Sequence, residues 1–91
     1  MDWYFYALLC ADGTYYAGVT TDLQRRLHEH NKTRKGAKYT RTRRPVSIVY
    51  STRYASRSEA QKAEAAFKKL SRDQKQNVIQ GWRSGGDEAS V

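Results

Sequence analysis

Cysteine and long apolar runs are both scarce in this 91-residue chain. The single cysteine, Cys10, excludes an internal disulfide and a metal centre built from several cysteines. No apolar stretch approaches the ~20 residues needed to cross a bilayer, and the N-terminus lacks the charged-then-apolar order of a signal peptide. We therefore expect a cytoplasmic protein with no membrane-spanning segment.

Acidic residues are also few. The 17 lysines and arginines outnumber the 9 aspartates and glutamates, which gives a formal net charge of +8. Such an excess favours a polyanionic partner through counterion release and electrostatic steering. A membrane surface is the competing polyanion, but the sequence shows no strongly amphipathic basic helix. We expect nucleic acid as the partner, DNA in the first place, with RNA left open.

The length of the chain suits one small domain. A chain of this size buries only roughly 60–65% of the surface that its unfolded form exposes. Seven tyrosines and two tryptophans supply large side chains for that core. The last eight residues carry no apolar pattern. We predict one domain over residues 1–83 and a disordered tail over residues 84–91.

Hydrophobic periodicity predicts an α/β (α+β) fold, with a small, three-stranded, mainly antiparallel sheet flanked by about three helices. The predicted strands cover residues 3–10, 14–18 and 46–54, and a tight turn at Asp12-Gly13 joins the first two. In the third strand, alternation places Val46, Ile48 and Tyr50 on one face. The helices are predicted to begin at capping boxes, in which Ser or Thr is followed three residues later by Glu or Gln: Thr21 with Gln24, Ser56 with Glu59, and Ser71 with Gln74.

The first two predicted strands each carry a tyrosine-bearing triplet, Tyr4-Phe5-Tyr6 and Tyr16-Ala17-Gly18. Alternation places Tyr6 on the face of Leu8, and it places Tyr16 and Gly18 on a shared face, so the two triplets can meet. Tyrosine is also a common packing residue in half-buried strands. The triplets alone therefore do not define a site.

The helix that follows separates two adjacent arginines. At about 100° per residue, Arg25 points away from the stripe formed by Leu23 and Leu27, whereas Arg26 lies about 60° from Leu23. His30, four residues after Arg26, falls on the same side. An ordinary basic surface helix is the alternative interpretation of this pattern.

A carboxylate interrupts the apolar face of the next long helix. Glu64 lies among Ala60, Ala63 and Phe67, where a buried charge is costly unless it is paired or binds a metal. Lys68, four residues later, offers the alternative of a simple surface ion pair.

Residues 32–44 form a basic arm that contains no acidic residue. A loop or partly ordered segment of this composition suits contacts to phosphates, with an aromatic side chain for stacking. A solvated loop is the alternative. The predicted nucleic-acid-binding residues are Lys35, Lys38, Tyr39, Arg41, Arg43 and Arg44.

From about Trp3 to Ile79 the chain resembles the GIY-YIG endonuclease superfamily, and within it the small stand-alone members that are similar to the Slx-type catalytic domain. Beyond the triplets, three segments carry the resemblance: Asp22-Leu23-Gln24-Arg25-Arg26-Leu27-His28-Glu29-His30-Asn31, Lys35-Gly36-Ala37-Lys38-Tyr39-Thr40-Arg41, and Lys68-Lys69-Leu70-Ser71-Arg72. The chain departs from the name-giving pattern at packing positions, and Val19 stands where the excision-repair branch has a lysine.

The resemblance implies a metal-dependent endonuclease that hydrolyses phosphodiester bonds in DNA, with Mg²⁺ as the expected ion and Mn²⁺ as the alternative. Branched or damaged DNA, the material of DNA repair, is the expected substrate class. The implied catalytic residues are Tyr6, Tyr16, Arg26, His30 and Glu64, with Glu64 as the metal ligand, Gly18 as a structural position, and Asn77 as a looser match.

A non-catalytic nucleic-acid-binding module or adaptor with the same fold is the alternative function. The complete set of tyrosines, arginine and carboxylate favours the nuclease, because binding alone would not require it. A protein partner is one source of specificity that we consider. The sequence does not indicate an oligomeric state.

Overall fold

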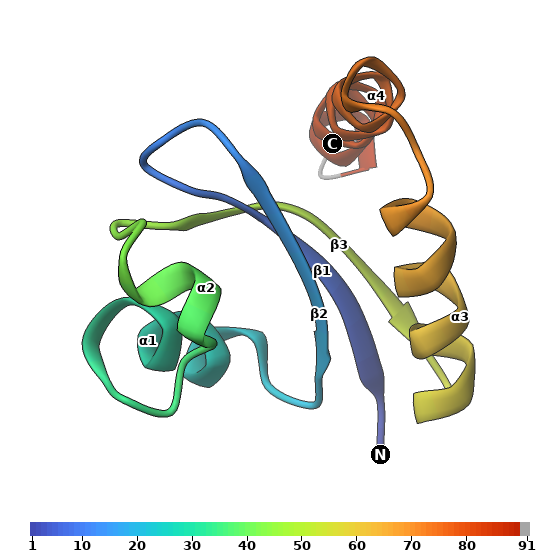
Figure 1. The fold of residues 1–91 in the computed structure, drawn as a ribbon. Helices are drawn as coiled ribbons and strands as arrows, with labels where there is room; N and C mark the ends of the chain where they lie inside the picture. Colours follow the sequence, from blue (N-terminus) through green and yellow to red (C-terminus); the bar gives the residue numbers. More distant parts are fainter. Residues whose placement is uncertain (90–91) are drawn as a thin grey trace.

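The computed structural model describes residues 1–89, and the side chains of residues 1–82. In chain order the elements are β1 (Trp3–Leu9), β2 (Tyr15–Thr20), α1 (Leu23–Lys32), α2 (Lys38–Arg41), β3 (Ser47–Tyr54), α3 (Arg57–Lys68) and α4 (Arg72–Ala89). The three strands form one antiparallel sheet in the order β2-β1-β3 (Figure 1). The predicted α+β fold is therefore confirmed, and the described residues contain four helices.

A tight hairpin joins β1 to β2. Gly13 adopts a positive φ of 86°, a conformation that glycine takes without strain. The Asp12 carboxylate accepts hydrogen bonds from the backbone N–H and the hydroxyl of Thr14, at 3.1 and 2.6 Å. The turn sets a register in which Tyr6 pairs with Gly18 across the two strands.

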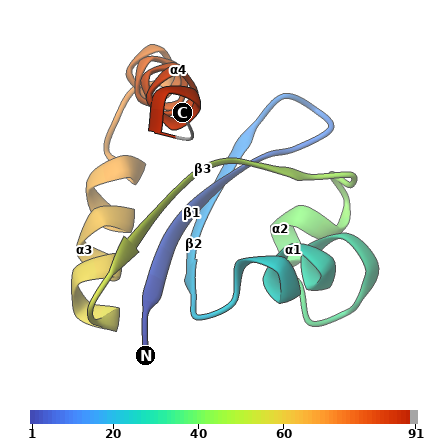
Figure 2. The ribbon, with the colours of Figure 1, turned by 180° about the vertical axis from the view of Figure 1, so that it is seen from behind.

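Helices cover both sides of the sheet. The helices α1 and α2 lie on one side, and α3 and α4 lie on the other (Figures 1 and 2). Each side has its own apolar cluster because successive strand residues point in opposite directions. Phe5, Ala7, Ala17, Val49, Phe67 and Ile79 form the first cluster, and Tyr6, Leu8, Cys10 and Val46 form the second.

A register shift in the pairing of β1 with β3 changes the predicted faces of β3. Ala7 pairs with Tyr50, but the next residue, Leu8, pairs with Ile48, so Val49 is an extra residue in the ladder. Val46 and Ile48 pack beside Leu8, whereas Tyr50 packs against Phe5 and Phe67 on the other side. The prediction that Val46, Ile48 and Tyr50 share a face is wrong, because strand alternation does not anticipate a bulge.

The helix starts follow local capping chemistry. Ser56 caps α3 as predicted, accepting a hydrogen bond from the backbone N–H of Glu59. Ser71 and Gln74 exchange both bonds of a capping box before α4. The α1 helix begins one residue later than predicted, because the carboxylate of Asp22, not the Thr21 hydroxyl, accepts from the backbone N–H of Arg25.

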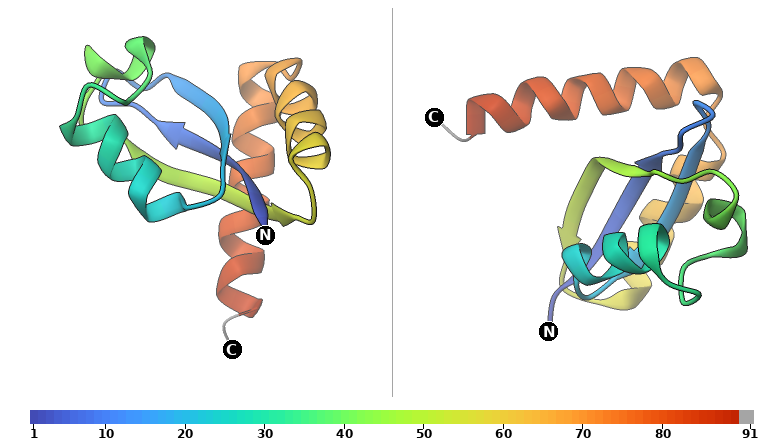
Figure 3. Two further views of the ribbon diagram at one scale, coloured as in Figure 1. Left: turned by 90° about the horizontal axis from the view of Figure 1, so that it is seen from below. Right: turned by 90° about the vertical axis from the view of Figure 1, so that its left-hand side faces the viewer.

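The basic arm and the C-terminal part of the chain both contain helical structure. Residues 38–41 of the arm form the short helix α2. The α4 helix, seen along its length in Figure 3, runs from Arg72 to Ala89. The disorder of residues 84–91 stays a prediction. Residues 90 and 91 lie outside the described residues, and the domain limit at residue 83 stays a prediction. Among residues 1–89, no helix is long and apolar enough to cross a membrane.

Candidate active site

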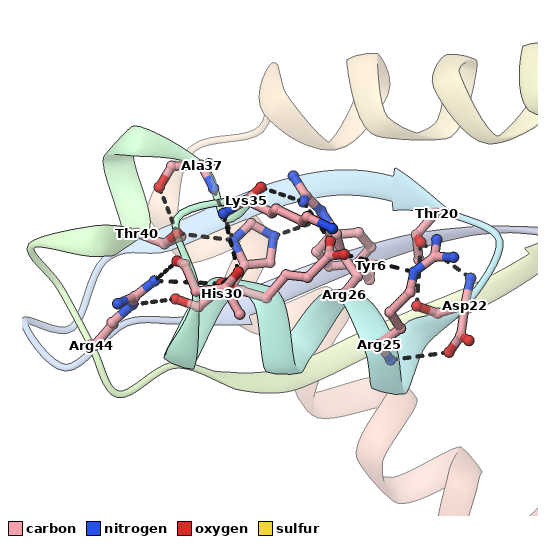
Figure 4. Close-up of polar contacts among 12 residues, drawn as sticks. Tyr6, Thr20, Asp22, Arg25, Arg26, His30, Lys35, Ala37, Thr40 and Arg44 are labelled. Atoms are coloured by element: carbon pink, nitrogen blue, oxygen red, sulfur yellow. Dashed lines mark hydrogen bonds and ion pairs between the residues drawn. The ribbon is translucent and has the colours of Figure 1, made fainter.

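Side chains from three elements meet beside the outer strand β2: Tyr6 from β1, Tyr16 from β2, and Arg26 and His30 from α1. Glu64 lies on α3, on the other side of the sheet, and its charge acts on Tyr6. The Tyr6 hydroxyl lies 2.8 Å from Nε2 of His30, and the ring of Tyr16 meets the edge of the His30 ring at a centroid distance of 5.4 Å. Figure 4 shows Tyr6 between His30 and Arg26. The two triplets therefore converge, as alternation predicts.

Tyr6 is buried, with an exposed fraction of 2%. Burial raises the pKa of Tyr6 to about 12, although the nearby Arg26 guanidinium opposes the rise. Tyr16 and Glu64 add smaller increases to this pKa. Tyr6 is thus a neutral hydroxyl at physiological pH, and it acts as a hydrogen-bonding group.

Gly18 makes the burial of Tyr6 possible. A β-carbon at position 18 would lie 2.6 Å from the Tyr6 hydroxyl oxygen and 2.8 Å from the ring carbon that bears it. In the structure the Tyr6 ring occupies that space.

His30 is completely buried and joins three elements. Its Nε2 contacts the Tyr6 hydroxyl, and its Nδ1 lies 2.9 Å from the hydroxyl oxygen of Thr40 in α2. Burial, followed by the charge of Arg26, lowers the pKa of His30 to about 4, so the ring is neutral at physiological pH. A buried His30 cannot contact substrate directly, and its influence on a reaction must pass through Tyr6 or Tyr16.

The hydrogen-bond chain behind His30 selects a tautomer. The Thr40 hydroxyl donates to the carbonyl of Ala37 at 2.9 Å, so its oxygen is left to accept from Nδ1–H of His30. Nε2 then carries the lone pair and accepts a hydrogen bond from the Tyr6 hydroxyl. The Ala37 N–H contact to Nδ1 is longer, at 3.4 Å, so we assign the tautomer from the shorter bond.

Arg26 is held at the border between the buried face of α1 and solvent. Its side chain is 26% exposed, against 58% for Arg25, so the prediction from helix phase is confirmed. One guanidinium nitrogen donates to the Glu29 carboxylate at 2.9 Å and to the Lys35 carbonyl at 2.8 Å (Figure 4). These partners fix the cation beside Tyr6.

Glu64 lies on α3 with its side chain 20% exposed and pairs with Lys68 at 2.8 Å. Its hydrogen bond to the ammonium raises the pKa of Lys68. No group of three or more His, Cys, Asp or Glu among the described residues could hold a metal ion. A single accessible carboxylate still suits Mg²⁺, which keeps several waters and takes one or two carboxylates together with substrate phosphates.

The sequence as a whole matches a known catalytic domain. The family model described as the GIY-YIG catalytic domain matches residues 2–77. The chain belongs to the GIY-YIG family. This domain type is a nuclease domain, which implies nuclease activity in general and binding of nucleic acid.

Similar proteins come from several bacteria. The UPF0213 protein DP2720 of Desulfotalea psychrophila is 48% identical over 91% of this chain and 76% of its own length. A UPF0213 protein of Enterococcus faecalis is 56% identical over 84% of this chain and 88% of its own length. These relatives are stand-alone members of the GIY-YIG family, as predicted. The similarity to the Slx-type catalytic domain stays a prediction.

Two solved structures share this GIY-YIG fold. The NMR structure of the UPF0213 protein BH0048 from Bacillus halodurans is 42% identical, with a TM-score of 0.56, over 88% of this chain and 84% of that chain. The NMR structure of EF2693 from E. faecalis is 52% identical, with a TM-score of 0.62, over 91% of this chain and 88% of that chain.

Members of the basic arm have different surroundings in the GIY-YIG domain. Tyr39 stacks on Tyr16 at a centroid distance of 5.9 Å, and the Arg43 guanidinium lies 3.8 Å from the centre of the Tyr39 ring. Arg43 also pairs with Asp12 at 3.0 Å. Of the other four predicted contacts, three have exposed side chains: Lys35, Lys38 and Arg41.

Arg44 has a structural role that the sequence analysis does not predict. Its guanidinium donates to the carbonyls of Glu29, His30 and Thr33, which end α1 (Figure 4). Carbonyls in the last turn of a helix lack the full set of partners within the helix, and here Glu29 also accepts from Thr33. Three carbonyls thus engage Nε and one terminal nitrogen of Arg44, and its role as a nucleic-acid contact stays a prediction.

Asn77 is not brought to the site. It is exposed on α4, the helix that packs against β3, and no hydrogen bond found among the described side chains connects it with Tyr6 or Glu64. Sequence reasoning also missed Thr40, which is fully buried behind His30. A threonine within a basic segment gives no signal of burial.

Proposed function

We propose that this GIY-YIG domain is an endonuclease that hydrolyses phosphodiester bonds in DNA with the help of a divalent cation. One observation carries the proposal: the Tyr6 hydroxyl hydrogen-bonds to His30 beside Tyr16 and Arg26, and the charge of the partly exposed Glu64 carboxylate acts on Tyr6. Their chemistry covers the needs of hydrolysis, which are a positioned water, a cation beside the phosphate and a metal ligand.

Tyr16 is the proposed contact to the attacking water. It is only partly buried, whereas Tyr6 is almost completely enclosed. The His30 edge on one side and Tyr39 on the other fix its ring. A fixed hydroxyl can orient water for in-line attack on phosphorus, with its oxygen accepting a hydrogen bond from that water.

Tyr6 and His30 are proposed as the support for Tyr16 and Arg26. Tyr6 donates a hydrogen bond to His30, so its oxygen lone pairs face the Arg26 guanidinium. Arg26 then stabilises negative charge that develops on the phosphoryl oxygens during attack. Holding this cation in place beforehand avoids a cost of reorganisation at the moment of reaction.

Glu64 is the residue that would hold the cation, with Mg²⁺ or Mn²⁺ as the candidates. The ion supplies Lewis acidity toward the phosphate when it is bound. In the structure the Lys68 ammonium pairs with one oxygen of the Glu64 carboxylate. Because this pair is largely exposed on the lysine side, an ion can displace it at little cost.

The same ion pair favours the second candidate function. Lys68 satisfies Glu64 without any metal, as a non-catalytic nucleic-acid-binding module or adaptor would need. A module that only binds nucleic acid would not require Tyr6 to be buried against His30, or Arg26 to be held beside Tyr6. We therefore place the nuclease first.

A cleavage assay separates the two functions. Linear, flap and junction DNA are incubated with Mg²⁺, Mn²⁺ or EDTA, using wild type, Glu64→Gln and the control Glu59→Gln, an exposed residue in the first turn of α3. We expect metal-dependent cleavage by wild type and Glu59→Gln, and loss of cleavage with retained binding in Glu64→Gln. Equal cleavage by both variants would refute the assignment of Glu64.

A further inference from the structure

A groove runs beside the outer strand β2, on the side of the site away from α1. It encloses a volume of about 170 Å³ and is lined by Tyr15, Tyr16, Tyr39, Phe67, Lys68 and Lys75. Figure 1 shows β2 at the edge of the sheet, between α2 on one side and α3 with α4 on the other. The groove thus connects three separate parts of the chain.

The charge of the groove is positive. Lys68 and Lys75 line it, and none of the described lining residues is acidic. The Lys75 ammonium lies 5.6 Å from the centre of the Phe67 ring. Arg72 extends the positive charge along β2, because its guanidinium lies 5.2 Å from the Tyr15 ring and donates to the Gly13 carbonyl. This surface suits phosphates, and it extends to Arg72, for which the proposed chemistry has no use.

Two of the lining residues belong to the neighbourhood of the candidate active site. Tyr16 is the proposed contact to the attacking water, and Lys68 pairs with Glu64 at 2.8 Å. A strand whose phosphate lies between Tyr16 and Glu64 therefore has its next nucleotide at the mouth of the groove.

The walls of the groove suit a single ring. The volume is well below the ~300–1,000 Å³ of pockets that enclose whole small molecules. Three tyrosines and a phenylalanine form most of the wall, and aromatic walls accept any base because every base has an apolar face. In a duplex the base is stacked and paired, so only an unpaired nucleotide can insert its ring here.

We infer that the β2-edge groove is a subsite for an unpaired nucleotide adjacent to the cleaved phosphate, with Lys75 and Arg72 binding the phosphates that follow. This inference rests on the proposed function and names its substrate class: DNA that is single-stranded at the point of cleavage. A protein strand added to the exposed edge of β2 is the competing occupant. The positive charges of Lys68 and Lys75 favour a nucleic-acid strand over a protein strand.

Binding measurements test the subsite without cleavage. Fluorescence anisotropy in EDTA follows a labelled thymidine oligonucleotide, single-stranded or annealed to its complement, over a range of salt concentrations. The proteins are wild type, Lys75→Gln, the charge-preserving Lys75→Arg, and the control Lys62→Gln. Lys62 is exposed on α3 and does not line the groove.

We expect wild type to bind the single strand several-fold more tightly than the duplex. Lys75→Gln should weaken single-strand binding and reduce its salt slope by about 0.7, the value for one phosphate contact. Lys75→Arg and Lys62→Gln should keep the wild-type slope. Equal slopes for Lys75→Gln and Lys62→Gln, or equal affinity for single strand and duplex, would overturn the subsite.

Failure of the subsite and failure of the proposed function give different results. If the protein cleaves DNA but Lys75→Gln binds the single strand with the wild-type salt slope, the subsite is refuted and the proposed nuclease function stands. Absence of binding to either oligonucleotide would refute both. Self-association detected by sedimentation, and abolished by Lys75→Gln without a change in oligonucleotide binding, would identify the groove as a protein contact and also overturn the inference.

Discussion

The hydroxyl of Tyr6 lies where the side chain of any other residue at position 18 would begin. The two residues are directly opposite in the β1–β2 pairing, and a β-carbon at position 18 would lie 2.6 Å from the Tyr6 oxygen. This close approach lets the Tyr6 hydroxyl reach His30 of α1 on the same side of the sheet. The missing side chain of Gly18, in the second triplet, thus leaves room for Tyr6 of the first.

Gly18→Ala should displace the Tyr6 ring and break its hydrogen bond to His30. Overpacking of this kind costs about 1–3 kcal/mol in the free energy of unfolding, measured by chemical denaturation. Gly81→Ala is the matched control, since a β-carbon there contacts nothing and alanine is favoured within a helix. Equal stability of the Gly18→Ala variant and wild type would contradict the packing.

His30 should resist protonation in the folded protein. Burial holds its pKa at about 4, below the unfolded value of about 6.5, so only the unfolded chain takes up the proton between these pH values. The free energy of unfolding should therefore decrease by roughly 3 kcal/mol as pH falls from about 6.5 to about 4.

An NMR titration measures this pKa directly. The chain has two histidines, so the His28→Gln variant leaves His30 as the single imidazole to observe. His28 is exposed, and its replacement should not disturb the fold. A titration midpoint for His30 at pH 6 or above would show that the ring is not enclosed as described.

Thr40→Val should change the tautomer of His30. Valine keeps the shape of threonine but removes the oxygen that accepts from Nδ1–H, and an unpartnered buried donor costs about 1–3 kcal/mol. The nitrogen chemical shifts of His30 report the tautomer, and Thr40→Ser should restore the wild-type shifts. An unchanged tautomer in Thr40→Val would assign Thr40 to packing alone.

Arg44 and Arg41 should separate stability from binding. Arg44→Gln removes the donors that cap three carbonyls of α1, so it should lower the free energy of unfolding by about 1–3 kcal/mol. Arg41→Gln should leave stability unchanged and reduce the salt slope of duplex binding by about 0.9, because Arg41 is exposed on α2. The reverse pattern would identify Arg44 as a nucleic-acid contact.

The parts of the site that sequence reasoning predicts are those set by local geometry. Strand alternation places Tyr6 and Tyr16 together, and helix phase separates Arg26 from Arg25. Both follow from the position of a residue within one element.

The remaining features depend on contacts between elements. The bulge at Val49, which turns Tyr50 to the other side of the sheet, arises only when β3 pairs with β1. Thr40 is buried because α2 folds back onto His30, and Arg44 caps α1 from 11 to 15 residues away. Neither composition nor periodicity indicates contacts between residues so far apart in the sequence.

The central claim is that Tyr16, Arg26 and Glu64 act as one hydrolytic site. Single-turnover cleavage of DNA in Mg²⁺ by Tyr16→Phe, Glu64→Gln and the double variant tests it most directly, with DNA affinity measured in parallel. Groups that act as a unit give strongly non-additive losses. We predict that the double variant cleaves about as slowly as Glu64→Gln alone, with DNA affinity retained. Independent, multiplicative losses, or cleavage that survives in the double variant, would contradict the account.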